Sequence, residues 1–218
     1  MTTSGLKRLT LATLAAGALV AALSACAPLV VGGVVVGGAL VATDRRTSGT
    51  QLEDEGIELR SANRIKDTVG DKAHVNVTSF NRQVLLTGEA PTAKDREQIE
   101  AVVRGVDNVR GVVNELAVMP NSSLTSRSND TLITGKVKAS LVDAKDLSLN
   151  AFKVVTERST VYLMGIVTTR EANRATEIAR GVGGVEKVVR VFEIVSEEEL
   201  ARTQPKPAPV VADPAAKN

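Results

Sequence analysis

The sequence predicts an α+β fold of two tandem domains, each with the element order αββαβ. The first observation is an internal repeat, in which residues 77–88 match residues 154–165 at an offset of 77. After a one-residue slip, the match resumes at an offset of 76, with Val102 opposite Ile178. The second observation is that the hydrophobic periodicity changes in the same order in both copies. Two copies of about 65 residues indicate a domain duplication rather than a solenoid.

A helix is expected at the start of each copy, because apolar residues recur there at intervals of four, as on one face of a helix. They are Ile65 and Val69 in the first copy and Ile133, Val137 and Leu141 in the second. A second helix follows a glycine in each copy. We expect these helices to open at Thr92 and Thr169 as N-caps, with Asp95 and Glu171 in the first turn.

Three strands complete each copy. Two runs in which β-branched residues alternate flank a polar turn, at residues 81–82 and again at residues 158–159. The runs are residues 75–77 and 84–86 in the first copy and residues 154–156 and 161–163 in the second. A third strand is expected over residues 109–118 and 185–195. Because each helix has one apolar face, the helices should cover one face of a small sheet.

The domains are expected to span residues 51–120 and 128–196. Residues 197–218 hold four of the seven prolines, together with alanine and lysine. Such a segment has too few apolar residues to pack, so this tail is predicted to be disordered.

Residues 1–25 have the organisation of a secretory signal peptide, with Lys7 and Arg8 before an apolar run. The four residues Leu23-Ser24-Ala25-Cys26 resemble the bacterial lipobox, in which the thiol is acylated and cleavage leaves the cysteine as the new N-terminus. We therefore expect lipidation of Cys26; the alternative is an unmodified cysteine after a plain cleavage site. Ala27 follows in place of Asp, which by resemblance to the enterobacterial sorting rule favours the outer membrane.

Residues 26–50 are expected to link the anchor to the first domain. Their apolar part, residues 28–42, contains four glycines. A membrane-spanning helix needs about 20 apolar residues, so cleavage before Cys26 would leave too short a run. We expect a flexible Gly/Val-rich linker near the bilayer surface, and a transmembrane segment is the alternative if cleavage fails.

Composition excludes several classes of function. The chain has one His, one Cys and no Trp, which argues against a histidine-based triad, a multi-Cys zinc site and a disulfide framework. His74 has no second His or Cys nearby in the sequence, so we expect a surface or half-buried residue and no metal site. The net charge is only +2, and loss of Lys7 and Arg8 makes the mature chain neutral, which argues against nucleic-acid binding.

The repeat resembles the BON domain. The residues that carry the resemblance are Gly88 and Gly165 after the second strand, and Gly105-Val106 and Gly181-Val182 before the third. The lipobox and the segment Ala42-Thr43-Asp44-Arg45-Arg46 are similar to those of lipoproteins with two BON domains. That resemblance implies an outer-membrane lipoprotein on the periplasmic face that binds anionic phospholipid, gathers at division sites and supports envelope integrity.

The first helix of the second copy is the candidate lipid site. A helical wheel places Ile133, Val137, Ser140 and Leu141 on the expected core side. The candidate lipid-binding residues are Leu132, Gly135, Lys136, Lys138, Ala139 and Val142. An apolar stripe beside lysines is typical of a helix that lies on an anionic bilayer. The resemblance also implies lipid contacts on this helix, although the related lipoproteins have an aromatic residue at the position of Leu132.

The corresponding helix of the first copy looks different. Aligning Ile65 with Val137 puts polar and charged residues opposite the candidate lipid face, which predicts a solvated surface. They are Arg60, Asn63, Arg64, Asp67 and Gly70. The alternative for the second copy is that Leu132 and Val142 pack against the first domain.

Two other functions are compatible with the sequence. The first is an adaptor whose outward face or strand edges bind a regulator of cell-wall amidases or a component of outer-membrane assembly. The second is an enzyme. We expect no catalytic residues and no cofactor, because no nucleophile with a neighbouring base is evident, although folding could bring two carboxylates together.

Overall fold

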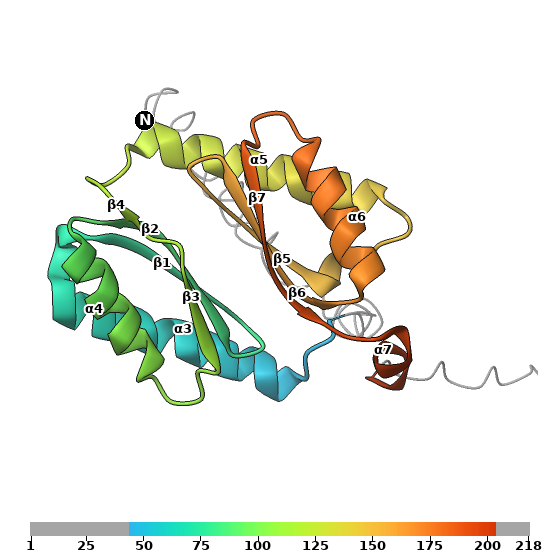
Figure 1. Cartoon of the computed structure of the whole chain (residues 1–218), viewed down its shortest axis with the longest axis horizontal. Coiled ribbons are helices and arrows are strands. Elements are labelled where there is room, and N and C mark those ends of the chain that lie inside the picture. Colours follow the sequence, from blue (N-terminus) through green and yellow to red (C-terminus); the bar gives the residue numbers. More distant parts are fainter. Residues whose placement is uncertain (1–43, 204–218) are drawn as a thin grey trace, which may run out of the picture. The chain divides into compact units, whose positions relative to one another are not determined.

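The structure is a computed structural model and describes residues 44–203 (Figure 1). The predicted signal peptide, Cys26, the linker up to residue 43 and the tail from residue 204 lie outside the described residues. Within residues 44–203, two αββαβ units follow one another along the chain. The predicted fold class is confirmed.

The first unit contains two helices and a mixed sheet. Its elements are α3 (Ser48–Val69), β1 (His74–Phe80), β2 (Gln83–Ala90), α4 (Ala93–Arg104), β3 (Gly111–Asn114) and β4 (Ala117–Val118). Strand β2 pairs antiparallel with β1 and parallel with both β3 and β4. The third predicted strand is thus broken in two. At the break, the Asn114 side-chain amide donates hydrogen bonds to the Arg96 carbonyl and the Glu100 carboxylate of α4. Leu116 is buried in the core.

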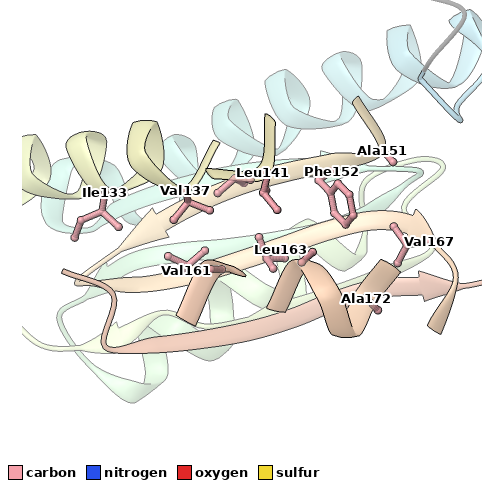
Figure 2. Close-up of a cluster of buried hydrophobic side chains, with 12 residues drawn as sticks. Ile133, Val137, Leu141, Ala151, Phe152, Val161, Leu163, Val167 and Ala172 are labelled. Atoms are coloured by element: carbon pink, nitrogen blue, oxygen red, sulfur yellow. The ribbon is translucent and has the colours of Figure 1, made fainter. Parts of the chain in front are cut away.

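The second unit repeats this topology. Its elements are α5 (Leu124–Asp143), β5 (Phe152–Glu157), β6 (Thr160–Val167), α6 (Thr169–Arg180) and β7 (Lys187–Ile194). Strand β6 is central, antiparallel to β5 and parallel to β7. Figure 2 shows Ile133, Val137 and Leu141 in a row along α5, above Val161 and Leu163 of β6. Both helices of each unit therefore cover one face of its sheet, as predicted.

The opposite faces of the two sheets share a third hydrophobic cluster. It consists of Phe80, Leu85, Tyr162 and Met164, all at most 5% exposed. Burial raises the pKa of Tyr162 to about 12, because the phenolate would lose its hydration there. The second face of each sheet is thus covered by the other domain.

Each β-hairpin turn depends on a buried aspartate in the preceding helix. Asn81 and Arg82 have φ of 50° and 64°, and the equivalent Arg158 and Ser159 have 48° and 56°. Two successive positive φ values are typical of a type I′ turn, which normally favours Asn-Gly. Asp54 accepts both turn N–H groups of the first hairpin at 2.7–2.8 Å. Asp130 accepts both of the second at 2.9 Å.

These aspartates correct the alignment of the two copies. Asp54 corresponds to Asp130, so Ile57 corresponds to Ile133 and Ile65 to Leu141, not to Val137. The predicted alignment was wrong by one helical turn, because apolar residues recur at every turn of this face. The residues of α3 opposite the candidate lipid face are therefore Gly56, Leu59, Arg60, Asn63 and Lys66.

Three predicted boundaries also change. Thr168 caps α6, not Thr169, because its hydroxyl and the Glu171 carboxylate form a reciprocal capping box. Helix α5 begins at Leu124, before the predicted residue 128. Residues 197–203, predicted to be disordered, form helix α7 (Glu197–Thr203), in which Leu200 is 6% exposed and Ser196 accepts the Glu199 N–H.

We expect Asp130→Ala to lower the free energy of unfolding by about 3 kcal/mol, because it leaves two N–H groups of a strained turn without their charged acceptor. Urea denaturation followed by circular dichroism measures this. The matched control is Asp143→Ala at the exposed end of the same helix, which should change stability by less than about 0.5 kcal/mol. Equal losses in both variants would contradict this role for Asp130.

Candidate functional site

The outward face of α5 is open to solvent along its whole length. Leu132 is 64% and Val142 58% exposed, so neither packs against the first domain. Gly135, Lys136, Lys138 and Ala139 are also exposed. A Cβ added to Gly135 would have no neighbour within 4 Å. The structure thus brings all six candidate residues to one outward surface.

Leu124 extends this surface beyond the predicted residues. It is 80% exposed and is the first residue of α5. On a helix with about 100° per residue it falls beside Val142, and the stripe from Leu124 to Val142 is about 27 Å long. Lys136 and Lys138 fall on opposite sides of that stripe. The sequence signal for Leu124 was its spacing of eight from Leu132, which was missed because the helix was expected to start later.

Helix α3 also exposes leucines, which the sequence analysis missed. Leu52 is 70% and Leu59 64% exposed, and they are seven residues apart on the same helix. The predicted alignment of the two copies missed them, because it was shifted by one helical turn. It therefore compared the α5 surface with the turn of α3 that follows Leu59. Glu53 and Glu55 lie beside Leu52 in the chain. Arg60 pairs with Glu53 at 2.6 Å, and Lys66 is exposed on the same face. This surface therefore combines apolar side chains with charges of both signs, unlike that of α5.

The segment before α3 is held to both domains. Arg45 makes a bidentate ion pair with Glu171 at 2.7 and 2.8 Å and also donates to the Ile166 carbonyl. Both side chains are at most 7% exposed. Arg46 pairs with Asp54 at 2.8 Å and lies 4.2 Å from the Phe80 ring centroid. Arg45 and Arg46 belong to the segment that resembles lipoproteins with two BON domains. Their side chains therefore make structural contacts with both domains.

A second polar cluster joins residues of both domains. His74 Nδ1 lies 3.0 Å from Glu89, and Asn76 donates to Glu157 at 2.9 Å. Arg158 pairs with Glu89 at 3.3 Å. Glu89 is fully buried and Glu157 is 3% exposed. His74 is half-buried, as predicted, with 20% of its side chain exposed.

The two glutamates of this cluster have opposite pKa shifts. Burial raises the pKa of Glu157, and the single amide of Asn76 does not compensate for it. Burial also acts to raise the pKa of Glu89, but hydrogen bonds from the Ser122 N–H, His74 and Arg158 hold that pKa below its usual value. Folding thus brings two carboxylates together, the arrangement that the sequence left open. Glu89 is the member of this pair that these donors engage.

Across residues 44–203, none of the helices combines the length and the apolarity that crossing a bilayer needs.

The BON domain matches residues 53–120 and 129–196. The chain belongs to the BON-domain family. Outer membrane lipoprotein DolP of Haemophilus influenzae is 38% identical over 172 residues, which cover 78% of this chain and 89% of that protein. The 21 kDa hemolysin of Actinobacillus pleuropneumoniae is 35% identical, covering 70% of this chain and 79% of that protein.

Osmotically-inducible protein Y of Escherichia coli is 39% identical over 144 residues, 64% of this chain and 72% of that protein. Two BON domains and this similarity make the chain a DolP-like dual BON-domain protein. The relatives support an outer-membrane lipoprotein of the BON family. The resemblance found in the sequence is confirmed at this level.

We expect Glu171→Gln to lower the free energy of unfolding by about 3 kcal/mol at pH 7, because Arg45 would stay buried without its counter-ion. Burial acts to raise the pKa of Glu171, but Arg45 and the Thr168 N–H hold that pKa below its usual value. The stabilisation is therefore present above the unfolded pKa of about 4.3 and is lost as pH falls through the lower folded pKa.

Urea denaturation of both proteins from pH 7 to pH 3 tests this prediction. The difference between wild type and Glu171→Gln should be constant above about pH 5 and shrink below it. The matched control is Glu177→Gln, an exposed glutamate of the same helix. A difference that stays unchanged at pH 3 would show that the Glu171 charge does not cause the stabilisation.

Proposed function

We propose that this protein is a non-catalytic outer-membrane lipoprotein, anchored through Cys26 on the periplasmic face. We further propose that it binds anionic phospholipid through the outward surface of α5 and supports envelope integrity, at division sites. The observation that carries the lipid assignment is the exposed apolar stripe from Leu124 to Val142 with a lysine on each side. The similarity of the chain to an outer-membrane lipoprotein supports the proposed outer-membrane location.

The physical chemistry of the α5 surface favours an anionic bilayer. Leu124, Leu132 and Val142 each expose more than half of their side-chain area, and burial in the acyl region would favour each by about 1–3 kcal/mol. Each lysine near an anionic surface adds about 1 kcal/mol. Gly135 and Ala139 between them are small, so the helix can approach the headgroups closely.

The lipid anchor changes what this helix has to do. A protein with several acyl chains is already held stably at the membrane. Tethering raises the local concentration of the α5 surface next to the bilayer, so that a weak affinity suffices. We infer that α5 selects lipid composition rather than retaining the protein. With Leu132 in place of an aromatic residue, the interfacial anchoring typical of Trp and Tyr is missing, and contact should be shallow.

A second candidate function is carried by α3. Leu52 and Leu59 are exposed among charged side chains that balance in sign, namely Glu53, Glu55, Arg60 and Lys66. The surface therefore lacks the excess of basic residues that an anionic bilayer attracts. Exposed apolar residues among charges are typical of protein-binding surfaces. An adaptor that binds an envelope protein, such as an amidase regulator or an assembly component, would use this face.

Co-sedimentation with vesicles tests the lipid proposal. Residues 44–218 are used, because they keep Arg45 and Arg46 and omit the apolar run of residues 28–42, which would itself contact vesicles. We expect binding to vesicles with about 30% phosphatidylglycerol and little binding to neutral vesicles. Leu132→Glu should weaken binding at least about tenfold, which corresponds to about 1.4 kcal/mol.

The matched control is Leu59→Glu, an equally exposed leucine on α3, which should bind vesicles like the wild type. Equal loss in both variants would refute the assignment to α5. Absence of binding to either kind of vesicle would leave the predicted lipidation of Cys26 as the sole membrane contact and favour the adaptor.

A further inference from the structure

Three potential metal ligands from both domains converge at one point. His74 lies on β1, Glu89 on β2 and Glu157 on β5, and one ligand atom from each lies within 4.8 Å of the others. Both carboxylates are at least 97% buried. No local sequence pattern indicates this cluster, because Glu157 follows His74 by 83 positions and the strands that carry the ligands belong to different copies.

Charge favours a cation at this point. Burying a carboxylate is costly unless it is paired. Glu89 has Arg158 as its counter-ion, whereas Glu157 accepts a hydrogen bond from the neutral Asn76 amide and forms no ion pair with a lysine or arginine within residues 44–203. The neighbouring Asp130 adds a further negative charge, and its two oxygens are taken by the turn N–H groups of Arg158 and Ser159. The three carboxylates outnumber the two guanidinium groups that border this point, those of Arg158 and Arg127, by one.

The cluster is also accessible. A cavity of about 230 Å³ borders His74 and Glu157 and extends along α5 past Thr131 and Thr134. Such a volume holds several water molecules. Arg127, whose guanidinium donates to the Ser122 hydroxyl and carbonyl, also lines this cavity. An ion could therefore enter with water and keep water ligands.

We propose that His74, Glu89 and Glu157 form a binding site for a zinc-like divalent cation that links the two BON domains. One imidazole nitrogen and two carboxylate oxygens are a ligand set that Zn²⁺ takes, with water in the fourth position. The imidazole selects zinc and its neighbours among the transition metals over Mg²⁺ and Ca²⁺. His74 and Glu89 are already 3.0 Å apart, a separation suited to two ligands of one ion, so Glu157 has the largest distance to close.

The site is independent of the lipid surface, and its test does not use lipid. Zinc is titrated by calorimetry into the untagged, EDTA-treated chain of residues 27–218, which lacks the thiol of Cys26. We expect one ion per chain and no saturable binding of Mg²⁺. Zinc at about a hundredfold above Kd should raise Tm by about 5 °C, because the ion binds only the folded, docked domains.

The single histidine of the chain gives a direct readout without mutation. The ring ¹⁵N resonances of His74 are uniquely assigned, because the sequence has one His. Zinc should shift the resonance of the coordinating nitrogen in step with the calorimetric titration. Unshifted ring resonances at saturating zinc would overturn the proposal, whatever the calorimetry shows.

The variants separate this site from surface carboxylates. Glu157→Gln should weaken zinc binding at least about tenfold, since it removes one charged ligand. Glu177→Gln, at an exposed position of α6, should leave the affinity unchanged. Equal zinc affinity in wild type and in a folded Glu157→Gln variant would overturn the proposal, as would the absence of saturable binding to the wild type.

Discussion

Mutual burial of the two sheets is the constraint on which the rest of this structure depends. The helices of each domain cover one face of a sheet, and the apolar side chains on the other face need a second cover. Phe80 and Leu85 from one domain and Tyr162 and Met164 from the other supply it. Helices α3 and α5 thereby become outward surfaces, since each lies on the face of its sheet opposite to this contact.

Charged groups around that contact specify how the domains pair. Apolar burial is non-directional, whereas the Arg45–Glu171 pair and the Asn76–Glu157 hydrogen bond each require one geometry. Arg158 contributes both to its own domain and to the domain contact. Its backbone N–H donates to Asp130 in the hairpin turn, and its guanidinium pairs with Glu89 of the other domain. The same hairpins that shape each sheet therefore also carry groups of the domain contact.

Features set by neighbours in the chain could be predicted, and contacts between distant residues could not. Helix and strand order followed from periodicity, and Thr92 was predicted as the cap that it is. The Arg45–Glu171 pair joins residues 126 positions apart, so no local pattern indicates it. Asp54 and Asp130 look like ordinary helix residues in sequence, yet their common offset of 76 was the signal that would have aligned the two copies correctly.

Correcting that alignment sharpens the argument about function. Leu132 and Val142 correspond to Gly56 and Lys66 in the first domain, so the duplicated helices share their buried faces and differ in their outward ones. Core packing explains why the equivalent buried positions 57 and 133 are both isoleucine. It does not constrain the identity of an exposed side chain. An apolar stripe between lysines on one copy alone therefore has no structural cause within residues 44–203. Function belongs to surfaces that a fold carries rather than to the fold itself, and in this duplicated fold the outward surface of α5 is the one that we propose for contact with an anionic membrane.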